Sequence, residues 1–329
     1  MTKPRDSPRQ MIAPKRCCTD WPLENDAQGD AGTAVHGNTL TVLMVTIVTI
    51  TVMQSIYSLQ AQGRTHVFDM TAVPWQATAK PGLWLKPVRM DDDKGHFLGL
   101  VRFDPFTRSG LHQHQGVATS LVIQGGLTNY HGPIHLHDAG INLAGSTHDA
   151  VAYEDTVLVS RLEAGVIYPP ASSISGVHAG SRYEDFCNPD PSVAPEINVP
   201  VDQQTAHATG IGGIARQGIF DYAGTGSDHR MVQLKLLPGA TASFVATHWT
   251  EFWVRGGNLV VNQQSADANA CVVCEAGAKV HWAAPFGALL IGWAEGREHY
   301  PAANANANAD ATANADAAPD LFGFGRRQC

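Results

Sequence analysis

Residues 110–148 read GLHQHQGVATSLVIQGGLTNYHGPIHLHDAGINLAGSTH, and this stretch decides the fold. His112 and His114 are separated by one residue, so in an extended strand both imidazoles point to the same face. Two imidazoles side by side supply half of a transition-metal site. His148 follows the turn AGST and opens the next strand, which makes it the best candidate for a third ligand. The sequence therefore predicts a three-histidine metal site inside an all-β barrel.

The bulk composition is typical of a chain with many short strands. The 329 residues are 44% hydrophobic and 16% charged, and they include 32 glycines and 19 prolines. A sizeable core and frequent turns are therefore expected, and the length suggests about two domains. The net charge of -8 argues against a sequence-independent nucleic-acid surface, because binding the phosphate backbone needs clustered Lys and Arg. We expect a small-molecule substrate and no nucleic acid as the partner.

The cysteines do not form the pattern of a disulfide framework. Six of them are scattered through a long chain, which favours a reducing, cytoplasmic location. Cys271 and Cys274 form a C-x-x-C with no second pair to complete a zinc site. Residues three apart on a strand face opposite sides, so ordinary packing is expected for both.

Residues 1–63 are expected to be an extension that is disordered or serves targeting. It contains the apolar run 40–53, LTVLMVTIVTITVM. The run is consistent with a signal peptide or with an anchor that continues to residue 59, although a membrane span needs about 20 apolar residues. The third interpretation is a β-prone extension, or an upstream segment that does not belong to the functional protein. Secretion or membrane anchoring through residues 40–59 thus stays open beside the cytoplasmic location, and membrane contact is expected only if that run is an anchor.

Short apolar runs separated by turn residues continue from residue 64 to residue 299. A second block repeats the order of the first: strand, loop, strand, double glycine, strand. This spacing favours sandwiches or closed barrels. We expect a metal-binding barrel over 64–175, a surface connector over 176–215, a second barrel over 216–299 and a disordered low-complexity tail over 300–329. The predicted strands are 97–103, 119–123, 127–130, 134–137, 141–143, 150–153 and 156–162, then 231–237, 251–254, 259–262, 271–274, 280–282 and 288–293.

The opening stretch resembles the two sequence motifs of the cupin superfamily. GLHQHQGVATSLVIQG is similar to the first motif, which has Gly, His-x-His, a spaced Glu and Gly, and LAGSTH is similar to the second, P-x-G-x-x-H. The two blocks together resemble a bicupin, similar to anti-sigma-factor (ChrR-like) cupin domains and to dihydroxyacetophenone or acetylacetone dioxygenases. The resemblance implies two tandem double-stranded β-helix, or jelly-roll, barrels.

The chain departs from these motifs at several positions. The glutamate of the first motif falls at Ala118, which implies three histidines without a carboxylate, as in the cupin dioxygenases that cleave carbon–carbon bonds of diketones and hydroxyketones. Leu143 replaces the proline of the second motif, and Ala152 stands where that motif often has Asn. The second block lacks His-x-His. Aligning the two double glycines places Ser243 and Val245 opposite His112 and His114, so we expect no metal in that half.

Three neutral imidazoles leave open positions on an octahedral ion, as a non-haem Fe(II) centre needs for binding a substrate and O₂ together. We therefore favour Fe(II), with Zn(II) or Mn(II) as alternatives, and expect a dioxygenase acting on a small diketone or hydroxyketone. Zinc with three histidines and a water would suit hydrolysis or a structural role. The alternatives are a non-catalytic zinc-binding sensor and an isomerase, although isomerases usually retain the Glu that Ala118 replaces. A homodimer is also consistent with the resemblance.

Other polar residues are candidates for the surroundings of the metal. His135 and His137 form a second His-x-His, which fits a rival ligand pair, residues that hold the ligand imidazoles, or plain strand residues. Side chains on flanking strands could orient a substrate oxygen by hydrogen bonding. The expected substrate pocket comprises Tyr130, His137, Tyr153 and Arg161. In the second block, His248, Glu251 and His281 fit either a remnant site or ordinary polar positions.

Overall fold

The computed structural model describes residues 56–57, 63–91, 93–129, 132–168, 197–221, 229–296, 299–300 and 319–323. Within these ranges the regular elements are strands, apart from one 3-10 turn, η3 (Val201–Gln203). The predicted all-β class is therefore confirmed. The apolar run 40–53 lies outside the described residues.

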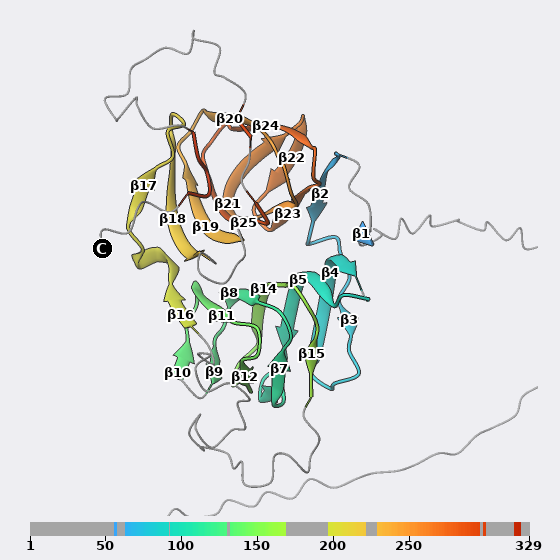
Figure 1. The fold of residues 1–329 in the computed structure, drawn as a ribbon. Coiled ribbons are helices and arrows are strands. Elements are labelled where there is room, and N and C mark those ends of the chain that lie inside the picture. Colours follow the sequence, from blue (N-terminus) through green and yellow to red (C-terminus); the bar gives the residue numbers. More distant parts are fainter. Residues whose placement is uncertain are drawn as a thin grey trace, which may run out of the picture. The chain divides into compact units, whose positions relative to one another are not determined.

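The first block forms one large sheet and two small ones (Figure 1). In the large sheet the strands follow the order β1, β4, β5, β14, β8, β11, β16, and β3 pairs with β4. The small sheets have the orders β10, β9, β13, β6 and β12, β7, β15. The large sheet consists of β1 (Ile56–Tyr57), β3 (Gln76–Ala77), β4 (Leu83–Asp91), β5 (His96–Phe103), β8 (Ala118–Gln124), β11 (Asp138–Asn142), β14 (Thr156–Leu162) and β16 (Ile197–Pro200). The small sheets consist of β6 (Thr107–Arg108), β7 (His112–His114), β9 (Leu127–Asn129), β10 (Gly132–Ile134), β12 (Thr147–His148), β13 (Val151–Ala152) and β15 (Val166–Ile167).

The second block is built around a sheet in the order β17, β18, β19, β25, β21, β23, β2, to which β20, β22 and β24 are joined. Its interior is filled by aromatic rings: the centroid of Trp282 lies 4.9 Å from that of Phe252 and 5.3 Å from that of Phe244. These rings belong to the buried core of the second barrel. The strands are β2 (Thr65–Asp69), β17 (Ala206–Ala208), β18 (Ile214–Asp221), β19 (Arg230–Leu236), β20 (Ala240–Val245), β21 (Thr250–Val261), β22 (Gln264–Asp267), β23 (Ala270–Cys274), β24 (Lys279–Ala284) and β25 (Ala288–Ala294).

The two faces of the large sheet in the first block have different surroundings. On β14, Leu158, Ser160 and Leu162 line a cavity inside the first barrel. The alternate residue Val159 belongs to a core shared by the two blocks, which also contains Trp293 of the second block. The Trp293 indole donates a hydrogen bond to Thr119 Oγ1 at 2.9 Å across this core. Strand alternation thus divides the sheet into a ligand-facing side and a side that joins the two blocks.

The C-x-x-C of β23 packs as predicted. Cys271 and Cys274 are both buried. Cys271 lies in the core shared by the two blocks, whereas Cys274 lies in the interior of the second barrel. The opposite faces of the two thiols confirm the strand parity inferred from their spacing, and burial raises the pKa of the Cys271 thiol.

Segments from both ends of the described chain complete the second barrel. β2 belongs to the range assigned to the first barrel, but it pairs with β23. Val67 therefore packs on the core of the second barrel, and Phe68 packs on the core shared by the two blocks. Leu321 and Phe322 belong to the range expected to be a disordered tail, but both are buried in the second core. The low-complexity sequence before this apolar pair predicts a disordered tail, but the two side chains are large enough to pack on the barrel.

The expected connector also contributes to the fold. β16 pairs with β11 at the edge of the large sheet, and Val201 is fully buried in the shared core. The segment alternates apolar and polar residues over only a few positions, which is too short a pattern to distinguish a strand from a surface loop.

Two strand boundaries differ from the predicted ones because of backbone turns. The sequence predicts a strand over 134–137 and a turn over 138–140, but β11 begins at Asp138, and the turn comes earlier because His137 adopts a φ of 70°. In the second block, β21 continues through the double glycine by a bulge. Gly257 permits this continuation because a Cβ there would lie 2.2 Å from the Gly287 carbonyl oxygen.

Candidate metal centre

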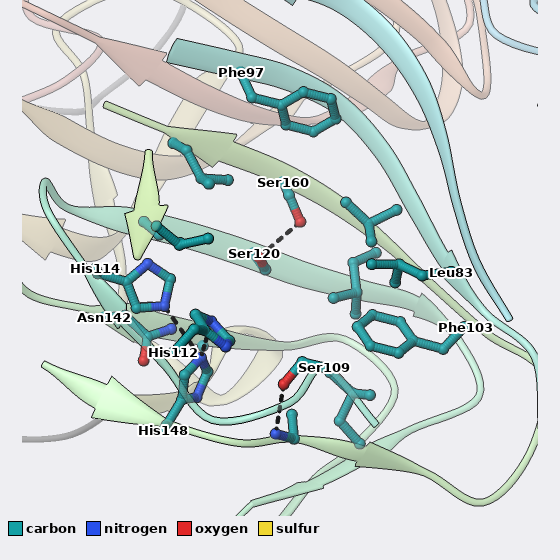
Figure 2. A pocket seen from close by; sticks show the side chains of 18 of the residues that line it. Leu83, Phe97, Phe103, Ser109, His112, His114, Ser120, Asn142, His148 and Ser160 are labelled. Carbon is teal, nitrogen blue, oxygen red and sulfur yellow. Dashed lines mark hydrogen bonds between the residues drawn. The ribbon is translucent and has the colours of Figure 1, made fainter. Parts of the chain in front are cut away.

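Three buried histidines converge at one end of the first-barrel cavity (Figure 2). The Nε2 atom of His148 lies 3.1 Å from Nε2 of His112 and 3.1 Å from Nε2 of His114. One nitrogen of each ring falls within 4.8 Å of the others. The structure thus brings together the three residues proposed from the sequence as metal ligands.

The small sheet β12, β7, β15 holds the three rings in place. His148 is the cross-strand partner of His112, and Val166 is the partner of His114. The turn before β12 folds back on β7: the N–H of Gly145 donates to the His114 carbonyl at 2.7 Å, and the His114 N–H donates to the Ser146 carbonyl at 2.9 Å. The Gly-Ser-Thr turn therefore sets the register that places the third histidine beside the first pair.

Burial keeps the two histidines of β7 neutral. Desolvation and the neighbouring His148 lower the pKa of His112 to about 3 and that of His114 to about 2. A carbonyl oxygen only accepts, so His112 donates Nδ1–H to Gly110 at 2.7 Å and presents an unprotonated Nε2 to the other rings. Neutral imidazole with a fixed tautomer is the form that binds a metal ion.

Asp149 braces the segment that carries His112. Its carboxylate accepts the Gly110 N–H at 2.9 Å and a hydrogen bond from Arg108 Nε at 2.9 Å. Ser109 Oγ contacts the same carboxylate at 3.3 Å. Asp149 follows His148 directly in the chain, so a single buried carboxylate constrains the backbone of two ligands. Sequence reasoning missed this residue, although an acid next to a ligand histidine is a usable signal.

The residues present fit a divalent transition metal. Ligand nitrogens at about 2.0–2.1 Å from one ion lie about 2.8–3.4 Å apart, depending on the coordination geometry, and the Nε2 separations of 3.1 Å fall in that range. The unprotonated Nε2 of His112 faces Nε2 of His148 at 3.1 Å, and a bound cation would accept the lone pairs of both nitrogens. No other group of three or more His, Cys, Asp or Glu ligands occurs in the described part of the chain.

The cavity next to the histidines is mainly apolar. It has a volume of about 360 Å³, which is within the range of small-molecule sites. None of its described lining residues is Asp, Glu, Lys or Arg. Figure 2 shows the histidines on one side, Leu83 and Phe103 on the other, and the Ser120 and Ser160 hydroxyls between them. The two hydroxyl oxygens are 2.7 Å apart.

Ala118 contributes only a methyl group to the cavity, and its neighbour is an amide. Ala118 on β8 is the cross-strand partner of Asn142 on β11, and both line the cavity. Asn142, Ser120 and Ser160 were not singled out from the sequence. The period-two alternation that places Ala118 toward the ligand also predicts Ser120 two residues later, so this signal was available for one of them.

The structure does not bring the described members of the expected pocket, His137, Tyr153 and Arg161, to the cavity. Tyr130 lies outside the described residues. His137 lies at a turn with its Nδ1 3.5 Å from Asp202 Oδ2, and Tyr153 is 60% exposed with its ring against Phe106. The turn at His137 and the short strand β13 place both side chains away from the cavity lining.

Arg161 points to the opposite side of β14 from the cavity. Its Nε donates to Glu251 at 2.7 Å, and Arg89 Nη1 donates to the other oxygen of Glu251 at 2.6 Å. Glu295 accepts hydrogen bonds from both guanidinium groups. Burial alone would raise the pKa of Glu251, but Arg89 and Arg161 outweigh that effect and hold the pKa below its usual value. Successive side chains on a strand alternate between its faces, so Arg161, next to the cavity-lining Ser160, points to the buried ion cluster between the two blocks.

The other histidines noted in the sequence lie apart from the metal centre. His135 is exposed and bonds to Asp138 in its own turn. His248 contacts Thr247, and His281 contacts Ser243 at 2.9 Å on the surface of the second block. Glu251 belongs to the ion cluster, so these residues do not assemble into a second site in the described structure.

The comparisons with known proteins agree with this fold and site. Residues 63–164, which contain all three histidines, match the family model of the ChrR cupin-like domain. This segment is therefore similar to the ChrR cupin-like domain. The predicted resemblance to the cupin superfamily is thereby confirmed, and the two tandem barrels give the chain the fold of a bicupin. No curated protein sequence matches the chain significantly.

Solved two-barrel structures resemble this bicupin in fold. A candidate dioxygenase of Nostoc punctiforme is 12% identical with a TM-score of 0.55, over 70% of this chain and 82% of its own. A single-residue mutant of Bacillus subtilis oxalate decarboxylase is 12% identical with a TM-score of 0.50, over 71% of this chain and 78% of its own. A further oxalate decarboxylase structure gives 12% identity and a TM-score of 0.51, over 74% and 80%. At this identity the likeness concerns the fold alone.

Among the described residues, no helix has the length and apolar character needed to cross a bilayer.

Proposed function

We propose that this metal-dependent cupin is a dioxygenase that acts on a small, mainly apolar diketone or hydroxyketone, with Fe(II) as its metal. The observation that carries the proposal is that three buried, converging imidazoles adjoin an apolar cavity whose described lining contains no Asp, Glu, Lys or Arg. A bound iron would supply positions for an oxygen-bearing substrate and for O₂.

The protein residues have separate roles in this proposal. His112, His114 and His148 would hold the ion and carry no negative charge, so the centre stays cationic and favours an anionic oxygen ligand. The apolar walls exclude water from the ligand and fit its carbon skeleton. The Ser120 and Ser160 hydroxyls offer a polar contact at an intermediate depth, for a second oxygen of the substrate.

The cavity argues against a dicarboxylate as the substrate. Buried carboxylates need cationic or multiple hydrogen-bonding partners. The lining described here contains no Lys or Arg, and the nearby buried arginine, Arg161, is engaged on the other face of β14. We therefore do not extend the activity of the structurally similar oxalate decarboxylases to this chain.

The experiment is anaerobic reconstitution with Fe(II), followed by O₂-electrode measurements with a panel of β-diketones, α-hydroxyketones and oxalate. The proposal predicts O₂ consumption coupled to loss of a diketone or hydroxyketone, and no turnover of oxalate. Turnover of oxalate alone would contradict it. The Zn(II)-loaded protein serves as the control because zinc has no redox chemistry.

A non-catalytic zinc-binding sensor is the second candidate, and the match of residues 63–164 to the ChrR cupin-like model favours it. Elemental analysis of protein purified without added metal separates the two. Stoichiometric zinc, together with no O₂ consumption after iron loading, would support the sensor. Manganese in place of iron would keep the site assignment and change the metal.

A further inference from the structure

One buried amide oxygen at the cavity has no hydrogen-bond partner in the described protein. It is Oδ1 of Asn142, a residue that is 6% exposed. Buried amides are nearly always hydrogen-bonded, since leaving one unpaired is unfavourable. An incompletely bonded amide that lines a ligand cavity is therefore a candidate for bonding to the ligand.

Asn142 lies where such a bond would act at the metal centre. β11 directs Gly140 and Asn142 to the cavity and Ala139 and Ile141 to the shared core. Figure 2 shows the amide beside His114 and His148. Its cross-strand partner is Ala118, and directly opposed Cβ atoms lie about 5 Å apart, so the methyl group leaves the amide free to face the cavity.

The amide has the chemistry to bind an oxygen atom without adding charge. Its oxygen and nitrogen have nearly the same shape, so either atom can be turned toward the cavity. With Nδ2 toward the cavity it donates to a ligand oxygen. A carboxylate in the same place would repel an anionic oxygen, whereas the neutral amide favours it.

We propose that Asn142 is a positioning residue that donates a hydrogen bond from its amide to an oxygen atom of the small molecule bound at the three-histidine centre. The inference rests on the proposed function, because it requires an oxygen-bearing ligand next to the ion. In this role Asn142 orients the ligand, whereas the three histidines bind the metal.

The test uses the full-length protein loaded with Co(II) and acetylacetone as the probe, followed by the visible absorption of cobalt. N142A is expected to keep one equivalent of Co(II) but to raise the Kd of the probe about 10-fold, as loss of one hydrogen bond implies. N142D, which keeps the shape and lacks the donor, is expected to weaken binding at least as much. Asn198 is the matched control: its Oδ1 is also buried and unpaired, and it pairs with Gly140 of β11, but it does not line the cavity.

The outcomes distinguish the inference from the function on which it rests. A normal probe Kd in N142A and N142D would overturn the role of Asn142 and leave the proposed function standing. An equal rise in N198A would also overturn it, because the effect would then be structural. If wild-type protein holds Co(II) but binds no acetylacetone, the proposed function fails and the inference fails with it. Support requires weaker binding in both Asn142 variants with unchanged cobalt content and an unchanged N198A.

Discussion

The ring of His112 donates its Nδ1–H to the carbonyl oxygen of Gly110 at 2.7 Å. The same glycine donates its own N–H to Asp149 at 2.9 Å. The Gly110 carbonyl thus fixes the tautomer of His112, and Gly110 is itself held by Asp149, the residue that follows His148. The candidate metal centre is therefore held by its backbone surroundings as well as by the strands that carry the histidines.

Replacing Asp149 tests this bracing. D149A should lower the affinity for Zn(II) or Co(II) about 10-fold, without loss of a ligand, because Gly110 and Arg108 lose their common partner. Competition with a chromogenic chelator measures the affinity. D155A is the control, since Asp155 also accepts from an arginine, Arg102, but away from the cavity. Equal affinities of D149A and wild type would refute the bracing role.

The lowered pKa values of His112 and His114 predict the pH dependence of the metal-free protein. Their folded values of about 3 and about 2 lie below the usual 6.5, so the unfolded chain binds more protons at mildly acidic pH. Their contribution to stability is complete above pH 6.5 and is lost as the pH falls toward 3. From pH 7.5 to pH 5 these two groups should remove about 4 kcal/mol.

Urea denaturation of the chelator-treated protein at pH 7.5 and pH 5 measures this loss. A double variant, H112Q with H114Q, should lose about 4 kcal/mol less than wild type over the same interval. Other histidines with lowered pKa, such as His96 and His137, contribute equally to both proteins and cancel. The same pH dependence in both proteins would exclude the two ligands as its source.

The first barrel was largely predictable because its strands are short, alternating and separated by turn residues. The boundaries of β14, 156–162, agree with the predicted strand. The departures arise where pairing is non-local. The run around Phe68 does not indicate that β2 pairs in the second block, because its partner strand β23 lies about 200 positions later in the chain. The pair Leu321 and Phe322 does not indicate its burial either, because it follows a low-complexity run that cannot form a core of its own.

The histidine ligands were predictable for a different reason from the rest of the site. Their spacing fixes a common face, and the Gly turn fixes the third member. Arg161 could not be placed in the same way, because a strand position that is shifted by one residue moves a side chain to the other face. Ser160 lies in the cavity and Arg161 lies in the ion cluster.

The ion cluster is predicted to support stability and not ligand binding. E251A would leave Arg89 and Arg161 buried without this partner and should lower the free energy of unfolding by about 3–5 kcal/mol. Metal content of the folded variant should stay normal, since the cluster faces away from the cavity. K94A, which removes an exposed ion pair to Asp91, should cost less than about 1 kcal/mol. Loss of metal from folded E251A would contradict this separation.

Phe322 should be a structural residue of the second barrel despite its place after a low-complexity run. Its ring centroid lies 5.8 Å from that of Phe252, and the residue is 1% exposed. F322A should lower the free energy of unfolding by about 3–5 kcal/mol, as for other buried aromatic truncations. Thermal and urea denaturation measure the change. A variant as stable as wild type would show that Phe322 does not pack on the barrel in solution.

Metal stoichiometry in His148→Ala tests the central claim most directly. The other two ligands are close in sequence, whereas His148 joins them only through the turn and the β7–β12 pairing. Plasma emission analysis of wild type and H148A, each reconstituted with Fe(II) and desalted, should give about one equivalent for wild type and a residual trace for the variant. H135A, which changes an exposed histidine outside the cavity, should keep the wild-type content. A full equivalent of iron in folded H148A would contradict the three-histidine centre.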